Sequence, residues 1–195
     1  MIYRVFAVLL ATLISTSATA ETIAIIGTGD VGKALGTEFA QQGHTIVYGS
    51  RDPERRKVAN LVAETGAGAS ASTPAKAAVD ADIVVLAVPG LLVEEITLSL
   101  GDLSGKIIID PTNPLERKLD RLEHAVDTSN AEIIQAAAPD AYVVKAFNTL
   151  NWKTMIDPAS SGGAVSVPLA GDSGEAKKKV AELVQGMGLD PIDVG

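Results

Sequence analysis

The chain has 195 residues, 47% of them hydrophobic, and carries a net charge of −8 at pH 7. This length suits one domain with a substantial core, and the acidic balance argues against nucleic-acid binding. The sequence contains no cysteine and only two histidines, His44 and His124, which excludes disulfides, a thiolate nucleophile and a cysteine-bound metal. We expect both histidines to be structural or solvated, and we therefore predict no metal site.

The first twenty residues have the composition of a secretory signal peptide. Arg4 precedes an apolar stretch over residues 5–14, and Ala18-Thr19-Ala20 fits the small-residue cleavage pattern. The stretch is too short to cross a bilayer as a helix. We expect cleavage after Ala20, a mature chain of residues 21–195 that is free of the membrane, and a periplasmic or secreted location. The alternatives are an uncleaved anchor or an over-extended start, and the latter would leave the protein in the cytoplasm.

A strand, a helix and a second strand are predicted directly after this segment. The run Thr22-Ile23-Ala24-Ile25-Ile26 is short and apolar, as buried strands are. From residue 31 to residue 42 apolar side chains recur at four-residue steps, which predicts an amphipathic helix. Gly43 then ends the helix, and residues 44–48 predict the second strand. Together these segments form a β-α-β unit.

The connection between the first strand and the helix reads Gly-Thr-Gly-Asp-Val-Gly, a complete G-x-G-x-x-G fingerprint. In a β-α-β unit this pattern indicates a dinucleotide-binding loop: Gly27 permits the turn, Gly29 admits the pyrophosphate and Gly32 lets the helix contact the strand. The N–H groups of the helix N-terminus would face the phosphates. The alternative is a structural turn that binds nothing. The predicted cofactor-binding residues of this loop are Gly27, Thr28, Gly29, Asp30, Val31 and Gly32.

Ser50 and Arg51 follow the second strand, where an NAD-binding chain places an acid to hold the ribose 2′-hydroxyl. A hydroxyl and a guanidinium favour a 2′-phosphate instead, because Arg forks onto phosphate oxygens. Arg55 lies close enough in sequence to join Arg51. The residue pattern therefore predicts NADP rather than NAD, and the alternative is a solvated basic patch. Asp52 is predicted to cap the next helix.

The rest of the chain continues the alternation. Strands are expected around residues 69–71 and at 83–88, 106–110, 142–146, 165–170 and 190–194. Helices are expected at residues 54–65 and 74–79, from the capping box of Ser129 and Glu132 to Pro139, and from residue 172 to residue 187. Residues 115–128 predict either a short helix or a functional lid. The pattern as a whole predicts a single-domain, Rossmann-type α/β fold, doubly wound around a mostly parallel sheet.

Ligands of such a sheet bind at the carboxyl ends of its strands. One strand ends at Val88-Pro89, and polar residues follow two others: Thr112 and Asn113 after the strand at 106–110, and Asn148 after the strand at 142–146. These side chains could orient an amide or an acceptor ring, or they could serve turn chemistry alone. Lys145 is expected to be only an edge charge.

Four motifs carry a resemblance to a known family: the glycine loop, Gly49-Ser50-Arg51-Asp52-Pro53, Asp110-Pro111-Thr112-Asn113-Pro114 and Val144-Lys145-Ala146-Phe147-Asn148-Thr149. The set resembles the NADP oxidoreductases that depend on the deazaflavin coenzyme F420, and equally the reductase domain of the six-transmembrane epithelial antigen metalloreductases. The resemblance covers nearly all of residues 22–195. It implies that the glycine loop, Ser50 and Arg51 hold NADP. It also implies that Val88, Pro89, Ala146 and Asn148 line the nicotinamide side.

The resemblance further implies hydride transfer between NADP(H) and a small-molecule acceptor, a deazaflavin or a flavin, in a protein that can form a homodimer. Transfer to a flavin-like ring requires no general acid or base, because the two rings carry the chemistry, and we predict no catalytic side chain. The chain ends at Gly195, before the tail that deazaflavin enzymes of this family use for the second cofactor. That end favours a second hypothesis, an NADP-binding module or redox sensor without turnover of its own. A third is a reductase of small carbonyls or imines.

Overall fold

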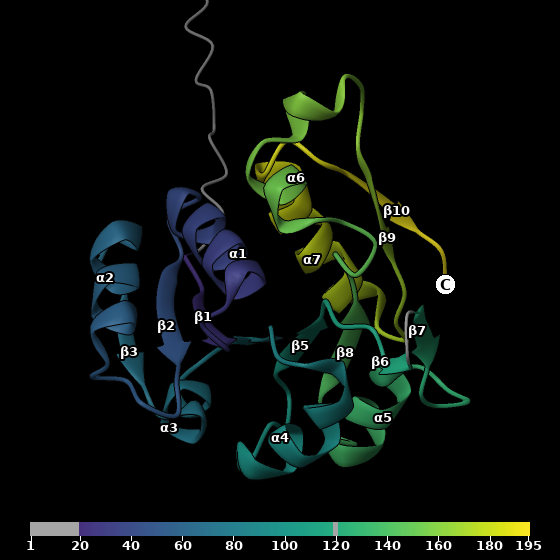
Figure 1. Ribbon diagram of the computed structural model, residues 1–195, viewed down its shortest axis with the longest axis horizontal. Helices are drawn as coiled ribbons and strands as arrows, with labels where there is room; N and C mark the ends of the chain where they lie inside the picture. The colour runs from purple at the N-terminus through teal and green to yellow at the C-terminus, as the bar shows by residue number, and fades with distance from the viewer. Residues whose placement is uncertain (1–19, 119–120) are drawn as a thin grey trace, which may run out of the picture.

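The computed structural model describes residues 20–118 and 121–195, so residues 1–19 of the predicted signal peptide lie outside the described part. Six parallel strands form the central sheet in the order β3-β2-β1-β4-β5-β8 (Figure 1). Their bounds are β1 Thr22–Ile26, β2 Thr45–Gly49, β3 Ser70–Ser72, β4 Ile83–Leu86, β5 Ile107–Asp110 and β8 Tyr142–Lys145. The strand order reverses between β1 and β4, which confirms the predicted Rossmann-type, doubly wound fold in a single domain.

Helices cover both faces of this sheet. One apolar core contains buried residues of α1, α2, α6 and α7, and the other contains those of α3, α4 and α5. Figure 1 shows α4 and α5 on the lower side of the sheet and α1, α6 and α7 on the upper side. The helices are α1 Asp30–Gln41, α2 Arg56–Thr65, α3 Pro74–Val79, α4 Val93–Ser99, α5 Asn130–Ala137, α6 Trp152–Ile156 and α7 Gly174–Gly186. All four residues of β4 are buried, as a strand covered on both faces requires.

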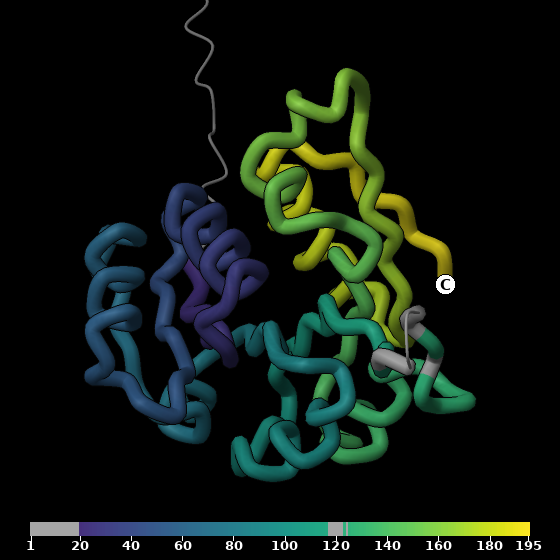
Figure 2. The backbone as a smooth tube through the Cα atoms, viewed as in Figure 1, coloured from purple at the N-terminus to yellow at the C-terminus, as the bar shows by residue number. Residues whose placement is uncertain are grey.

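The C-terminal segment extends the sheet beyond β8. The strands β9 (Ser166–Leu169) and β10 (Asp190–Asp193) pair in parallel, and an antiparallel bridge between Lys145 and Ala170 attaches them to β8. Figure 2 shows this segment, in green and yellow, on the β8 side of the molecule. Ser173 caps α7 by accepting from the Ala176 N–H at 3.2 Å. The helix buries the face predicted from its periodicity, namely Ala176, Val180, Leu183, Val184 and Met187.

Three local predictions were wrong or incomplete. The short helix that was one alternative for residues 115–128 is wrong, because β6 (Leu115–Lys118) pairs in antiparallel with β7 (Arg121–His124). The other alternative, a lid, stays a prediction. The helix α2 begins at Arg56, with Arg55 as its N-cap and no side-chain cap; Asp52 instead belongs to a turn that the Ser50 hydroxyl closes. The helices α4 and α6, of seven and five residues, were not predicted.

His44 has a structural role at the amino edge of the sheet. Its side chain is buried, its Nδ1 accepts from the Glu21 N–H at 3.1 Å, and burial lowers the pKa of the imidazole. In residues 20–118 and 121–195, no group of three or more His, Asp or Glu side chains could hold a metal ion. No helix of the described residues has the length and apolar character needed to cross a membrane.

Candidate functional site

The glycine loop lies where β1 ends, between the ends of β2 and β4. The Gly27 N–H donates to the Gly49 carbonyl at 3.0 Å, and Gly27 has a φ of +112°. A Cβ at Gly27 would lie 2.1 Å from the carbonyl oxygen of Ala87, and one at Gly32 would lie 2.2 Å from the Gly27 carbonyl. Both positions therefore require glycine for backbone packing, which makes the loop compact and places it against its two neighbouring strands.

Gly29 differs from these two glycines because open space surrounds it. It is the N-cap of α1 in an extended conformation, and no atom lies within 4 Å of a Cβ built on it. No side chain caps the helix, and no hydrogen bond within the described residues engages the N–H groups of Asp30, Val31 and Gly32. Three free N–H groups and the positive end of the helix dipole therefore face this space, which suits a phosphate. Thr28 is half-buried beside them, and Asp30 is exposed.

Ser50, Arg51 and Arg55 lie at the end of β2, next to this loop. Ser50 is buried, and its hydroxyl donates to the Asp52 carbonyl at 3.0 Å and accepts from the Asp52 N–H at 3.2 Å. This turn directs the chain away from the sheet. Arg51 and Arg55 are exposed and form no ion pair with any residue that the structure describes. The two guanidinium groups therefore remain available to an anion.

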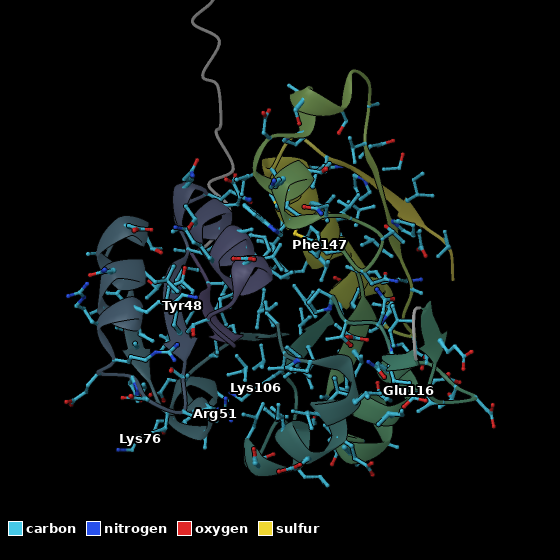
Figure 3. All side chains as sticks on the ribbon, viewed as in Figure 1. Tyr48, Arg51, Lys76, Lys106, Glu116 and Phe147 are labelled. Atoms are coloured by element: carbon cyan, nitrogen blue, oxygen red, sulfur yellow. The ribbon has the colours of Figure 1, made fainter. Side chains whose placement is uncertain are left out.

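Lys76 is an exposed cation on the helix that begins beside the end of β2, and sequence reasoning missed it. In the view of Figure 3, both Lys76 and Arg51 lie in the lower left part of the molecule. Lys76 belongs to α3, and the first residue of that helix, Pro74, has its Cα 3.1 Å from a Cβ built on Gly49. Parallel pairing of β2 with β3 brings the start of α3 to the end of β2. Lys76 could therefore have been recognised from the sequence only if the strand order had been known.

The loops after β4, β5 and β8 meet on the other side of the glycine loop. The Asn113 side-chain amide donates to the Asn148 carbonyl at 2.8 Å, and the Asn148 amide donates to the Asn113 Oδ1 at 3.2 Å. Thr112 is held locally by Asp110, as turn chemistry predicts. The amide pair, by contrast, joins two loops that are 35 residues apart. Val88 is half-buried and Pro89 exposed along the same edge.

Lys145 is not an edge charge, and that prediction was wrong. Its Nζ lies 2.7 Å from the Asp110 Oδ2, with the side chain of Asp110 fully buried and that of Lys145 18% exposed. The Lys145 ammonium also donates to the Thr112 carbonyl. Because β9 continues the sheet beyond β8, the lysine lies inside the protein, where a charge needs a partner.

Ala146 and Phe147 follow β8 in an unusual backbone conformation. Phe147 has a φ of +66°, which is rare for a bulky side chain. Both residues are fully buried, and the Phe147 ring packs on Phe39 of α1 with the ring centroids 6.2 Å apart. Phe147 lies in the interior between α1 and the C-terminal helices (Figure 3). The left-handed turn brings Asn148 to the surface of the carboxyl edge.

A cavity of about 310 Å³ lies between α1 and α6. Its walls are mostly apolar, and the half-buried Trp152 gives them an aromatic face. Burial raises the pKa of Glu38 at this cavity. The full set of lining residues is Asp30, Lys33, Ala34, Thr37, Glu38, Trp152 and Ile156. Through Asp30 the cavity adjoins the glycine loop.

The fold, the glycine loop and the uncapped helix define a Rossmann-type dinucleotide-binding domain. Residues 22–114 match the family described as NADP oxidoreductase coenzyme F420-dependent. The chain is 30% identical to the F420-dependent NADP reductase of Methanothermobacter thermautotrophicus, in a match that covers 89% of the chain and 80% of that enzyme. The chain therefore belongs to the family of F420-dependent NADP oxidoreductases.

Two further matches agree with this membership. A crystal structure from Arthrobacter sp. FB24, assigned as an F420-dependent NADP reductase, shares 33% identity at a TM-score of 0.83 and covers 90% of this chain and 85% of that one. Metalloreductase STEAP3 of Rattus norvegicus is 32% identical over 90% of this chain. The chain spans about a third of the length of this metalloreductase, 34% by the match.

Proposed function

We propose that the chain is an NADP(H)-dependent oxidoreductase that passes hydride between NADPH and a flavin-like or deazaflavin acceptor. The observation that carries the proposal is the open helix N-terminus at Gly29 beside the unpaired Arg51. The first suits a pyrophosphate, and the second suits a 2′-phosphate rather than a bare ribose. Arg55, and Lys76 from the start of α3, would add positive charge around that phosphate.

In this proposal the dinucleotide extends along the carboxyl edge of the sheet. The adenosine end lies after β2, the pyrophosphate at α1, and the nicotinamide beyond β4. Val88 and Pro89 would flank the nicotinamide on one side and Asn148 on the other. Ala146 is fully buried and would support that second wall from behind. The cofactor supplies the hydride, and the protein binds and orients the two rings within ~3.5 Å of each other. Proton transfer by a side chain is not required.

Two observations support a flavin-like or deazaflavin ring as the hydride acceptor. The relatives that this chain covers over most of their length are named F420-dependent NADP reductases. The cavity between α1 and α6 adjoins the glycine loop and offers the aromatic face of Trp152, as sites for planar ligands often do. A module without turnover of its own is the second candidate, since the metalloreductases that it matches are about three times longer, with 34% of STEAP3 covered.

Arg51→Ala tests the choice of cofactor. We expect the wild-type chain, residues 21–195, to bind NADPH more tightly than NADH. The variant should lose about 1.5–3 kcal/mol of NADPH binding, the contribution of a charge-assisted hydrogen bond, and its NADH affinity should stay the same. Fluorescence titration of both nucleotides measures this. Lys178→Ala, which removes an exposed cation on α7, is the matched control; an equal loss in both variants would contradict the assignment of Arg51.

Turnover tests the acceptor. We expect the chain to oxidise NADPH when a deazaflavin or a free flavin is added, because these rings accept hydride without a protein acid. Absorbance at the nicotinamide band, followed with F420, FMN and FAD in turn, measures the rate. Tight NADPH binding with no oxidation by any of the three would favour the module without turnover. Oxidation by ketones or imines alone would favour the third hypothesis.

A further inference from the structure

A buried ion pair underlies the carboxyl edge of the sheet, and the proposed chemistry does not use it. The carboxylate of Asp110, at the end of β5, is 0% exposed, and the ammonium of Lys145, at the end of β8, lies 2.7 Å from it. Lys145 also donates to the Thr112 carbonyl. A buried carboxylate without this cation would be strongly destabilised.

The second carboxylate oxygen of Asp110 starts a chain of hydrogen bonds. It accepts from the N–H and the hydroxyl of Thr112, at 2.9 and 2.6 Å. The Asn130 amide in turn donates to the Thr112 hydroxyl at 2.6 Å and to the Gly90 carbonyl at 3.0 Å. Thr112 and Asn130 are both buried. The cluster of Asp110, Thr112, Asn130 and Lys145 thereby joins β5, β8, α5 and the loop after β4.

This cluster holds three loops at the carboxyl edge of the sheet. Gly90 directly follows Pro89, and a Cβ at Gly90 would lie 2.0 Å from the Asn113 carbonyl, so the loops after β4 and β5 are in close contact. Asn113 directly follows Thr112 and pairs with Asn148 of the loop after β8. These are the loops that would flank the nicotinamide in the proposed function.

We propose that Lys145, through Asp110 and Thr112, is a positioning residue for the nicotinamide half of the dinucleotide. This inference rests on the proposed function. A buried ion pair contributes little stability compared with apolar side chains of the same volume. The ion pair instead fixes geometry, because the Lys145 ammonium at the end of β8 holds the backbone of the loop after β5 through the Thr112 carbonyl. The adenosine half, at the ends of β1 and β2, is held by other contacts and does not depend on it.

The test compares two ligands on one variant. Adenosine 2′,5′-bisphosphate carries the 2′-phosphate but no nicotinamide. For Lys145→Met we expect its affinity to stay within about twofold of the wild type, and that of NADPH to fall by about tenfold, the equivalent of one lost hydrogen bond. The fluorescence of bound NADPH should also shift toward that of the free nucleotide, because the nicotinamide is no longer held. A purely structural role would weaken both ligands together.

Lys106→Met is the matched control. Lys106 also donates to two backbone carbonyls, those of Val79 and Ala81 at 2.9 and 2.7 Å, but at the amino edge of the sheet. We expect it to leave the ratio of the two affinities unchanged. If Lys145→Met does not fold, Asp110→Asn/Lys145→Met removes both charges and should show the same selective loss of NADPH. Unchanged NADPH affinity, or equal loss of both ligands, would overturn the inference, whereas failure of the wild type to bind NADPH would overturn the proposed function itself.

Discussion

Gly29→Val is expected to abolish high-affinity NADPH binding and to leave the fold intact. The backbone of Gly29, with φ −82° and ψ −170°, is extended and acceptable to a β-branched residue. No atom lies within 4 Å of the added Cβ, so the cost in stability should stay near that of a poor N-cap, about 1 kcal/mol. The side chain would fill the space that the pyrophosphate needs. Losing one or two charge-assisted hydrogen bonds weakens binding by roughly 30- to 1000-fold.

Gly27→Ala is the contrasting variant. Its Cβ would meet the Ala87 carbonyl at 2.1 Å on a backbone with φ +112°, so we expect loss of stability and of binding together. Urea unfolding, combined with NADPH titration, separates the two variants. If Gly29→Val bound NADPH like the wild type, the phosphates would not lie at the helix N-terminus, and the placement of the whole dinucleotide would be wrong.

Periodicity and turn chemistry were sufficient to predict the central sheet. The apolar run that becomes β4 and the capping box of Ser129 and Glu132 are local features. Both appear in the structure, although β4 ends at Leu86, two residues before its predicted end. The glycine fingerprint has a partly local cause, since Gly32 is required by contacts within the first β-α-β unit, whereas Gly27 also packs against the Ala87 carbonyl after β4. Such features are readable because their partners are close in sequence.

The parts that the sequence did not predict depend on distant partners. Lys145 was interpreted as an edge charge because its partner Asp110 lies 35 residues away on the neighbouring strand. Lys76 was not recognised because only the order of the strands brings α3 to the end of β2. The paired strands β6 and β7 both carry charges and show no apolar alternation, so their sequence resembles a loop.

The difference between contacts close in sequence and contacts between distant segments also suggests how the domain could bind the phosphates and orient the nicotinamide through separate groups of residues. Contacts around the glycine loop and the end of β2 would anchor the phosphates. Contacts among Asp110, Thr112, Asn130 and Lys145, from three separate segments, would orient the nicotinamide. Variants of the first group should therefore change affinity for the whole dinucleotide. Variants of the Asp110, Thr112, Asn130 and Lys145 cluster should weaken binding of the nicotinamide half and leave binding of the adenosine half unchanged.

Phe147→Ala is expected to destabilise the protein by about 3–5 kcal/mol, the usual cost of deleting a fully buried phenylalanine. The ring is 0% exposed and packs on Phe39. Phe147→Gly provides a sharper test, because φ is +66° at this position. At ordinary positions glycine is less stable than alanine by about 0.5–1 kcal/mol. Here glycine avoids the left-handed penalty, so Phe147→Gly should be at least as stable as Phe147→Ala.

The free energies of unfolding can be measured in urea by the fluorescence of Trp152, the only tryptophan of the chain. Phe147→Leu keeps most of the buried area and serves as the control, with an expected loss smaller than that of either deletion. A glycine variant less stable than the alanine variant by about 1 kcal/mol would show that residue 147 is not left-handed. The turn that brings Asn148 to the Asn113 amide would then need another backbone path, and the nicotinamide wall proposed from it would lose its basis.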